Sequence, residues 1–463
     1  MIRRAAALLS CCIAAVGLAN DRPPNLVLIV ADDLGYADVG FNGCEDIPTP
    51  HIDRIADEGA RFGAGYVTAA VCAPSRAGFI TGRHQDRFGC SINPTVDPSQ
   101  LNGIPADERN IAELLAPAGY TSMAVGKWHL GTHPSEAPRV RGFDEFYGFL
   151  TGGHVYFPEQ LDLNDLSEVR RKWGWYRTKL LHNGERVGTD QYLTDELSKR
   201  AAEFIEREAG RGPFFLYLAY NAPHTPLQAL EQDLARFDHI SDPDRRTYAA
   251  MVGAMDRGIG WVLDAIEQRG IDDDTLVVFL SDNGGASNNA SRNDPLRGHK
   301  GSAFEGGLRV PFAMRWPRVI PEGLDYPHPV SSLDIAATFV AAAGDMAQAA
   351  VRETHPLDGV DLMPHLNDPG LPPPHAALFW RWHGRDSWAA RDATGKLIVG
   401  RRGAQTYAIE QDVSESEDLD GTVQGEAIMN RIQALYRRWV EPMIAPIHQP
   451  LGSWRPGARD RND

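Results

Sequence analysis

The sequence predicts an α/β fold: a large mixed, mostly parallel sheet flanked by helices, followed by a smaller C-terminal α+β subdomain. Short apolar runs of the kind found in buried strands alternate along the chain with segments of helical periodicity. This alternation implies parallel strands covered by helices on both faces. After about residue 357 the composition changes, and three consecutive prolines at 372–374 resemble a linker to the second unit.

The strands of the main unit are predicted from apolar runs at residues 25–31, 121–125, 214–218 and 275–280. Helices are predicted from apolar spacing and capping residues over 51–62, 107–118, 189–208, 245–269 and 332–343. Thr49 and Pro50 start the first of these helices, as N-cap and first-turn residue. Thr189 and Ser332 are the predicted caps of two others.

Two regions fall outside this alternation. Residues 151–188 form an aromatic and charged insertion with a hairpin turn at Asn183-Gly184. We interpret most of it as a surface excursion, although its histidines and aromatic residues also suit a wall of a substrate cleft. The C-terminal subdomain, 371–463, has strand-like runs at 377–382 and 395–399 and a final helix at 425–440.

The N-terminus predicts export. Arg3 and Arg4 precede an apolar run over 5–19, which is typical of a cleaved signal peptide covering residues 1–19. We therefore expect a periplasmic or secreted protein. No later run approaches about 18 apolar residues, so no stable membrane span is expected.

Charge and cysteine content narrow the function further. The net charge of −16 argues against nucleic acid as a partner, although a local basic pocket can still bind an anionic substrate.

Beyond the predicted signal peptide only Cys44, Cys72 and Cys90 remain. Because three cysteines cannot all pair with one another, at least one thiol in such an exported chain is expected to have a role other than an internal disulfide. If that thiol is Cys72, then Cys44 and Cys90 are free to form a disulfide, which the sequence does not establish.

Oxygen-bearing side chains directly follow two of the predicted strands. Asp32 and Asp33 come after the first strand, and Asp282 and Asn283 come after the run at 275–280. Ligands bind at the carboxyl ends of strands in parallel sheets, and carboxylate and amide oxygens suit calcium better than zinc. Taken alone, each pair is more often part of a turn. The position of both pairs at the ends of predicted strands favours a metal site.

Basic side chains follow the other predicted strands or lie in polar loops. They are Arg76, Lys127, His129, His224 and Lys300. Together such groups surround a tetrahedral oxyanion and stabilise its charge. Taken singly, each has a structural alternative: a buried histidine, a surface arginine or a loop lysine.

Residues 72–82, CAPSRAGFITG, resemble the signature C-x-P-S-R-x-x-x-x-T-G of type I sulfatases, in the alkaline phosphatase superfamily. The resemblance continues in order through ADDLGY, GKWHLG, NAPHTP, SDNGG and GHKGSAFEGG. It implies an alkaline-phosphatase-like fold with a sulfatase catalytic domain over 20–370. Ile80 stands where the family often has leucine, and the C-terminal part matches only in general character.

The resemblance implies that Cys72 is a precursor. In the family, a separate maturation enzyme oxidises this cysteine to formylglycine (3-oxoalanine). One hydroxyl of the hydrated aldehyde attacks sulfur, and the other later expels sulfate by restoring the aldehyde. The calcium ligands implied are Asp32, Asp33, Asp282, Asn283 and the modified Cys72.

Further roles follow from the same resemblance. Arg76 is expected to hold the formylglycine hydroxyls, and Lys127 and Lys300 to bind sulfate oxygens. His129 is the expected base during sulfate elimination, and His224 the expected acid for the leaving alcohol. Lys300 could share that acid role, and the sequence does not separate the two.

These inferences predict an exported, calcium-dependent sulfatase acting on a sulfated polysaccharide or oligosaccharide. His154 is predicted to contact sugar, with a purely structural role as the alternative. One competing hypothesis is a phosphate or phosphonate ester hydrolase on the same scaffold, which is the nearest in chemistry. Another is a catalytically silent carbohydrate-binding homologue that is never matured.

Overall fold

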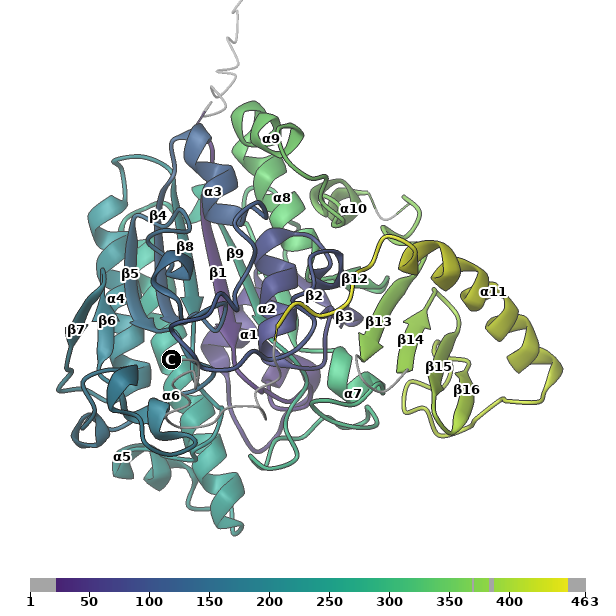
Figure 1. Ribbon diagram of the computed structural model, residues 1–463, viewed down its shortest axis with the longest axis horizontal. Helices are drawn as coiled ribbons and strands as arrows, with labels where there is room; N and C mark the ends of the chain where they lie inside the picture. Colours follow the sequence, from purple (N-terminus) through teal and green to yellow (C-terminus); the bar gives the residue numbers. More distant parts are fainter. Residues whose placement is uncertain (1–21, 369, 383–386, 449–463) are drawn as a thin grey trace, which may run out of the picture.

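The computed structural model describes residues 22–368, 370–382 and 387–448 of the chain (Figure 1). Its main unit is a ten-stranded sheet in the order β11-β2-β10-β9-β1-β8-β4-β5-β6-β7. The central strands are β1 (Asn25–Ala31), β4 (Thr121–Lys127), β8 (Phe214–Ala219) and β9 (Thr275–Ser281). The outer strands are β2 (Ala60–Phe62), β5 (Glu145–Phe149), β6 (Leu180–His182), β7 (Glu185–Val187), β10 (Phe312–Arg315) and β11 (Leu324–Tyr326).

The sheet is mixed but parallel at its centre, which confirms the predicted fold class. Strand β1 pairs in parallel with both β8 and β9, and β4 pairs in parallel with β8 and β5. Strands β10 and β6 run antiparallel to their neighbours β9 and β5. The register places Ala31 opposite Ser281 and Val30 opposite Ala219, so the central strands end at one edge.

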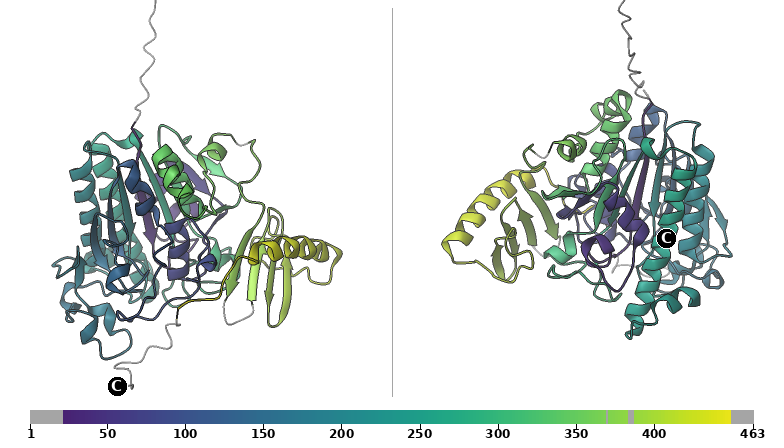
Figure 2. Two further views of the ribbon diagram at one scale, coloured as in Figure 1. Left: turned by 45° about the horizontal axis from the view of Figure 1, so that its top comes forward. Right: turned by 180° about the vertical axis from the view of Figure 1, so that it is seen from behind.

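Helices cover both faces of the sheet, as Figure 2 shows. Alternate residues of β1 enter two separate cores, as expected for a strand buried on both sides. One face packs against α1 (Pro50–Asp57), α4 (Leu193–Glu208) and α6 (Pro243–Gln268). The other packs against α2 (Cys72–Thr81), α3 (Ile111–Leu115), α8 (Asp334–Ala343) and α9 (Asp345–Arg352).

Several predicted helix boundaries were wrong. Helix α1 ends at Asp57 because the chain must enter β2, and a Cβ on Gly59 would lie 2.1 Å from the carbonyl oxygen of Met314. The hydroxyl of Thr49 does not cap α1; it accepts from the Gly40 amide and donates to Asp53.

Three other helices also begin later than predicted. Asn110 caps α3 through a capping box with Glu113, so this helix starts at Ile111. Helices α4 and α8 begin after Tyr192 and Leu333, beyond the predicted caps Thr189 and Ser332.

The insertion is partly a sheet element rather than a surface excursion. Strands β6 and β7 form the predicted hairpin, with Asn183 at φ 53° and Gly184 at φ 97° in its turn. Both residues need positive φ, which the Asn-Gly pair supplies at little strain. The hairpin pairs with β5 and extends the main sheet.

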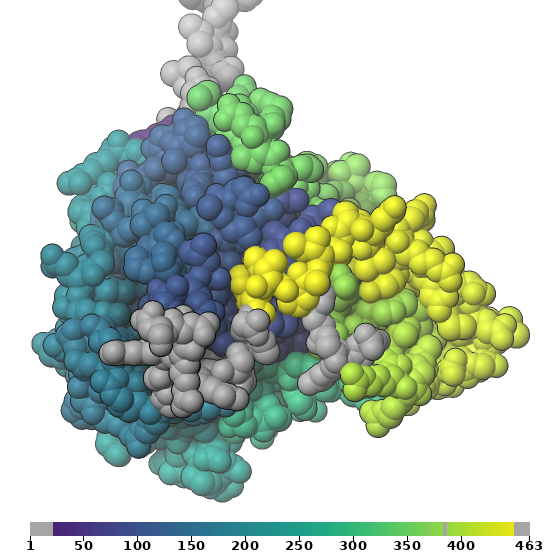
Figure 3. Space-filling view, in the orientation of Figure 1, coloured from purple at the N-terminus to yellow at the C-terminus, as the bar shows by residue number. Residues whose placement is uncertain are grey.

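The C-terminal subdomain is α+β, as predicted. It contains an antiparallel sheet of β13 (Leu378–Trp382), β14 (Ser387–Arg391), β15 (Lys396–Gly400) and β16 (Gly403–Tyr407), covered by α11 (Val423–Val440). After α11 the chain returns to the main unit. The amides of Ile444 and Ile447 donate to the carbonyls of Asp86 and Gly89. Figure 3 shows this segment in yellow against the dark blue surface.

The remaining expectations concern disulfides and the membrane. Cys44, Cys72 and Cys90 are all free, so the open possibility of a Cys44–Cys90 bridge is not realised. The Cys44 thiol donates to Asp46 instead, and Cys90 Sγ lies 3.1 Å from a ring nitrogen of His448. The predicted signal peptide, 1–19, lies outside the described residues. Within them, no helix combines the length and apolar character that a bilayer crossing requires.

Candidate active site

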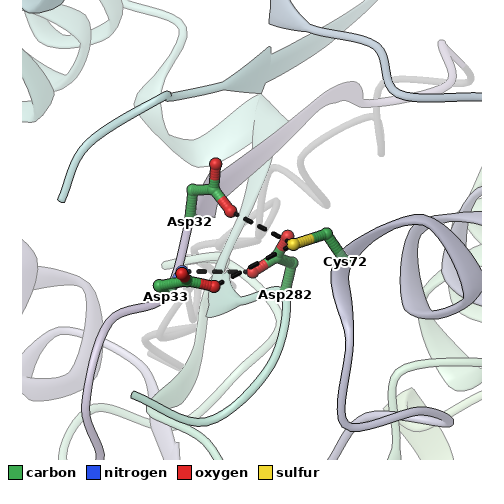
Figure 4. Close-up of side chains that lie close together, drawn as sticks. All are labelled: Asp32, Asp33, Cys72 and Asp282. Carbon is green, nitrogen blue, oxygen red and sulfur yellow. Dashed lines mark hydrogen bonds between the residues drawn. The ribbon is translucent and has the colours of Figure 1, made fainter. Parts of the chain in front are cut away.

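Three buried carboxylates meet at the carboxyl edge of the central strands (Figure 4). Asp32 and Asp33 follow β1, and Asp282 follows β9, whose last residue pairs with the end of β1. Asp33 adopts a positive φ of 65°, and its amide donates to Asp282 Oδ1 over 3.2 Å. The turn after β1 therefore directs two adjacent carboxylates into the same space.

Cys72 faces these carboxylates from the first position of α2, a helix that is buried along its whole length. Its Sγ lies 3.7 Å from Asp32 Oδ1 and 3.9 Å from Asp33 Oδ1. Ligand atoms of Asp32, Asp33, Cys72 and Asp282 all lie within 4.8 Å of one another. Burial raises the pKa of Cys72 to about 12, so the unmodified side chain is a thiol and a poor nucleophile at neutral pH.

Two lysines contact the cluster, each through a different aspartate. Lys127, at the end of β4, donates to Asp32 Oδ2 over 2.6 Å. Lys300 donates to both oxygens of Asp33, at 2.6 and 2.8 Å, and to Cys72 Sγ at 3.2 Å. Cys72 thus lies beside two ammonium groups in a buried site, where electrostatic interactions are strong.

Arg76 lies one helical turn after Cys72 and is completely buried. Its Nε and Nη2 contact Asp282 Oδ2 at 2.9 and 2.8 Å, and Nη1 donates to the hydroxyl of Tyr217 over 3.2 Å. Burial opposes its charge, but Asp282 outweighs this effect and raises the pKa of Arg76. Tyr217 is a site residue that the sequence did not indicate, because it lies within an apolar strand.

The three carboxylates differ in protonation. Burial raises the pKa of Asp32 to about 7, although Lys127 opposes the shift. Burial acts on Asp33 and Asp282 in the same direction, but Lys300 and Arg76 respectively outweigh it and hold both pKa values below the ordinary value.

The donor set fits a hard divalent cation. Its donors are carboxylate oxygens of Asp32, Asp33 and Asp282 and the amide oxygen of Asn283. Asn283 Nδ2 donates to Asp33 Oδ1 over 2.8 Å, while its buried Oδ1 has no hydrogen-bond partner among the described residues. A buried oxygen without a partner beside carboxylates suits a calcium ion, which prefers oxygen ligands.

Two neutral histidines complete the site. His129 follows β4 with a φ of 55°, and within the part of the chain that the structure describes its buried Nδ1 has no hydrogen-bond partner. Burial and the charge of Lys127 hold the pKa of His129 well below its ordinary value. His224 Nδ1 lies 2.6 Å from the Thr225 carbonyl, and burial lowers its pKa to about 4. At neutral pH, His129 is therefore able to accept a proton.

The structure brings all the predicted site residues except His154 into one place. His154 is completely buried, with Nδ1 3.0 Å from the Val155 carbonyl and Nε2 2.8 Å from the Thr178 carbonyl. Both ring nitrogens are occupied by the main chain, and no surface is left for a sugar. The predicted sugar contact is corrected to the structural alternative.

A cleft of about 830 Å³ opens over Cys72 and Lys300. The insertion supplies one wall through Trp173, Tyr176 and Arg177. The Tyr176 ring lies 6.3 Å from that of His224, so this wall reaches the cluster of predicted site residues. The sequence indicated a wall in this insertion but not which residues form it. Trp173 is exposed whereas Trp175, two positions later, is buried, and the sequence does not distinguish the two.

Comparison with known proteins agrees with this geometry. The Sulfatase family model matches residues 24–345. The chain is similar to arylsulfatase J of Mus musculus, with 32% identity over 83% of this chain and 62% of that protein. It is 35% identical to N-acetylgalactosamine-6-sulfatase of Canis lupus familiaris, over 74% of this chain and 66% of that protein. It thus spans just under two thirds of both relatives.

Among solved structures, the chain is similar to Ps i-CgsB in complex with k-i-k-neocarrahexaose. The TM-score is 0.85 with 40% sequence identity, covering 92% of this chain and 95% of that one. The family match includes β1, α2, β8 and β9, which carry or position the cluster around Cys72. The chain therefore belongs to the sulfatase family.

Proposed function

We propose that the protein is an exported, calcium-dependent sulfatase that hydrolyses sulfate esters on a sulfated polysaccharide or oligosaccharide. The observation that carries this proposal is the position of Cys72. It lies in the sulfatase signature, buried within a carboxylate cluster suited to calcium that the ammonium groups of Lys127 and Lys300 contact. Its protonated thiol is a poor nucleophile, which supports conversion to formylglycine before catalysis.

Calcium would be held by Asp32, Asp33, Asp282 and Asn283, and would stabilise negative charge on sulfate oxygens. Formylglycine would supply a hydroxyl nucleophile together with a route for sulfate to leave by elimination.

The protein's own side chains perform the remaining tasks. Lys127 and Lys300 orient the sulfate group and stabilise the charge that develops on its oxygens. His129, neutral at pH 7, accepts the proton that is lost during sulfate elimination. Lys300 and His224 both line the cleft, and either is a candidate to protonate the departing alcohol.

The cleft supports a carbohydrate substrate. Its volume of about 830 Å³ is in the range of pockets that enclose a whole organic ligand, far larger than a sulfate ion. Trp173 is 46% exposed on its wall, with Lys172 Nζ 4.9 Å from the indole ring. An aromatic face beside cationic groups suits a sugar ring that carries more than one sulfate. The N-acetylgalactosamine-6-sulfatase and neocarrahexaose relatives support the same substrate class.

Sulfate release from a panel of sulfated glycans tests the proposal. The protein is produced together with a maturation enzyme, with Cys72→Ala as control, and conversion of Cys72 is checked by peptide mass. The panel contains carrageenan, glycosaminoglycan, fucan and ulvan types, with matched sulfate and phosphate esters of one small alcohol. We expect release by the parent protein alone and loss of release with a calcium chelator. Faster turnover of the phosphate ester would favour the phosphate or phosphonate esterase instead.

An unconverted Cys72 in protein from the native host would favour the silent carbohydrate-binding homologue. Conversion of Cys72 with no release from any member of the panel would contradict the proposed substrate class.

A further inference from the structure

The segment that carries Lys300 is a loop of residues 297–304 followed by α7 (Glu305–Leu308). Near Lys300, two main-chain hydrogen bonds join this loop to the main unit, in addition to the contacts of the Lys300 side chain with Asp33 and Cys72. The amide of Lys300 donates to the Gly285 carbonyl over 3.0 Å, and the amide of Gly301 donates to the Ala70 carbonyl over 2.7 Å. The fixed position of this loop places the Lys300 ammonium group 3.2 Å from Cys72 Sγ.

The C-terminal subdomain holds the end of this loop through a buried charge cluster. Lys396, on β15, lies 2.8 Å from Glu305 Oε1 and 2.8 Å from Glu415 Oε1. Glu415 Oε2 also accepts from the amide of Glu305 over 2.7 Å. All three side chains are completely buried. The hydroxyl of Tyr66 donates to the other oxygen of Glu305, so the cluster joins both units.

The subdomain also contacts the start of the loop. Arg297 Nη1 donates to the Glu415 carbonyl over 3.0 Å and to the Tyr407 hydroxyl over 3.3 Å. Phe304 packs into the apolar cluster that contains Tyr407. The loop is therefore held by the C-terminal subdomain three positions before Lys300 and five positions after it.

Removal of Lys396, the cation that Glu305 and Glu415 share, is expected to move Glu305 in one direction. Without Lys396, the carboxylates of Glu305 and Glu415 are left buried without their shared cation and repel each other. Glu305 keeps Arg309 at 3.7 Å, and movement of Glu305, with the end of the loop, away from Glu415 relieves the repulsion. We expect the Lys300 ammonium group to be displaced with it, because Lys300 lies only five positions before Glu305.

We propose that Lys396 and Glu415 are positioning residues for catalysis, which set the place of the Lys300 ammonium group through Glu305 and the loop. This inference rests on the proposed role of Lys300 in binding the sulfate group. The C-terminal subdomain then contributes to the reaction without any of its residues in this cluster touching the substrate.

A double-mutant cycle tests the proposal by measuring kcat/KM for the sulfate ester of one small alcohol. Lys300→Met is expected to lower kcat/KM by about 10²- to 10³-fold, as for removal of a group that stabilises developing charge. Lys396→Met is expected to lower it by roughly 10- to 100-fold through misplacement. In the double variant the Lys396→Met effect should disappear, leaving the value of Lys300→Met alone. Losses that multiply would overturn the proposal.

Two further variants separate positioning from loss of stability. Arg315 is a buried cation between Glu58 and Asp272 near the amino end of β9, far from the site along the strand. Arg315→Met should lower the melting temperature and leave kcat/KM within about twofold. Arg297→Met changes an exposed side chain, so it should fold even if Lys396→Met does not.

Arg297→Met is expected to lower kcat/KM by a smaller factor, again only while Lys300 is present. An unchanged kcat/KM in both Arg297→Met and Lys396→Met would refute the inference while leaving the proposed function intact. Failure of the parent protein to release sulfate would refute the proposed function first.

Discussion

Calcium binding is expected to release a proton from Asp32, so that calcium affinity depends steeply on pH. Burial raises the pKa of this carboxyl to about 7; Lys127 opposes the shift, whereas Asp282 and Asp33 add to it. Below pH 7 the carboxyl is therefore mostly protonated in the metal-free protein. A carboxylate must be ionised to bind a metal ion, so proton and calcium compete for Asp32.

The size of this pH dependence follows from the shift in the pKa of Asp32. The pKa of Asp32 rises from 3.8 to about 7, and each unit corresponds to about 1.4 kcal/mol. Because the folded pKa is above the unfolded one, the ionised carboxyl destabilises the metal-free protein by roughly 4 kcal/mol above pH 7. This destabilisation is absent below about pH 4 and grows as the pH rises. The Kd for calcium should accordingly fall about tenfold per pH unit from pH 5 to 7, and then level off.

Isothermal titration of metal-free protein with calcium checks this expectation. Titrations at pH 5, 6, 7 and 8, in buffers of different ionisation enthalpy, give both the Kd and the number of protons released. His224 does not interfere, because its pKa of about 4 lies below this range. Asp32→Asn should bind calcium more weakly, with no slope over the same range. A parent Kd that stays constant between pH 5 and 7, or a slope retained in Asp32→Asn, would refute the reasoning.

Further predictions concern the base, the cleft wall and the junction between the two units. His129→Gln should lower kcat by about 10²- to 10⁴-fold with little change in KM, measured as steady-state sulfate release; an unchanged kcat would remove His129 from the role of base. Trp173→Ala should raise KM for sulfated oligosaccharides but not for a small aryl sulfate, whereas Trp261→Ala, which removes a 38% exposed tryptophan outside the cleft lining, should change neither. Equal effects of the two tryptophan variants would contradict a sugar-binding role for the wall. Burial acts to lower the pKa of His375, but Asp334, 2.9 Å away, outweighs it and raises that pKa. The pair's stabilisation is full below about pH 6.5 and is lost as the pH rises through the raised value, so His375→Gln should lower the melting temperature at pH 6 more than at pH 9. Equal losses at both pH values would exclude the charged pair.

The sequence predicted the centre of the sheet well because its strands are unbroken apolar runs. The run at 25–31 became β1 with identical bounds, and polar residues directly after such runs meet at one edge by the geometry of parallel pairing. That rule brought Asp32 and Asp282 together although they lie far apart in the chain.

Other features depended on packing that no local pattern encodes. The segment 72–81 contains proline, serine and glycine, residues that favour turns, yet it forms α2. The helix is stable there because its whole surface is buried against the sheet and neighbouring helices. His154 was misassigned because main-chain carbonyl partners leave no trace in the sequence. The contact between Glu305 and Lys396 joins residues 91 positions apart and could not be predicted either.

The burial of Cys72 has a consequence for the order of events in the proposed conversion to formylglycine. Cys72 is only 2% exposed, so the oxidising enzyme of that proposal would reach it only before the surrounding elements have assembled. The last carboxylate of the cluster, Asp282, is translated 210 positions after it. At about 5 to 20 residues per second, the ribosome adds that stretch in roughly 10 to 40 s. The proposed conversion would therefore compete with folding, and a variant that delays assembly of β9 should carry a larger fraction of converted Cys72.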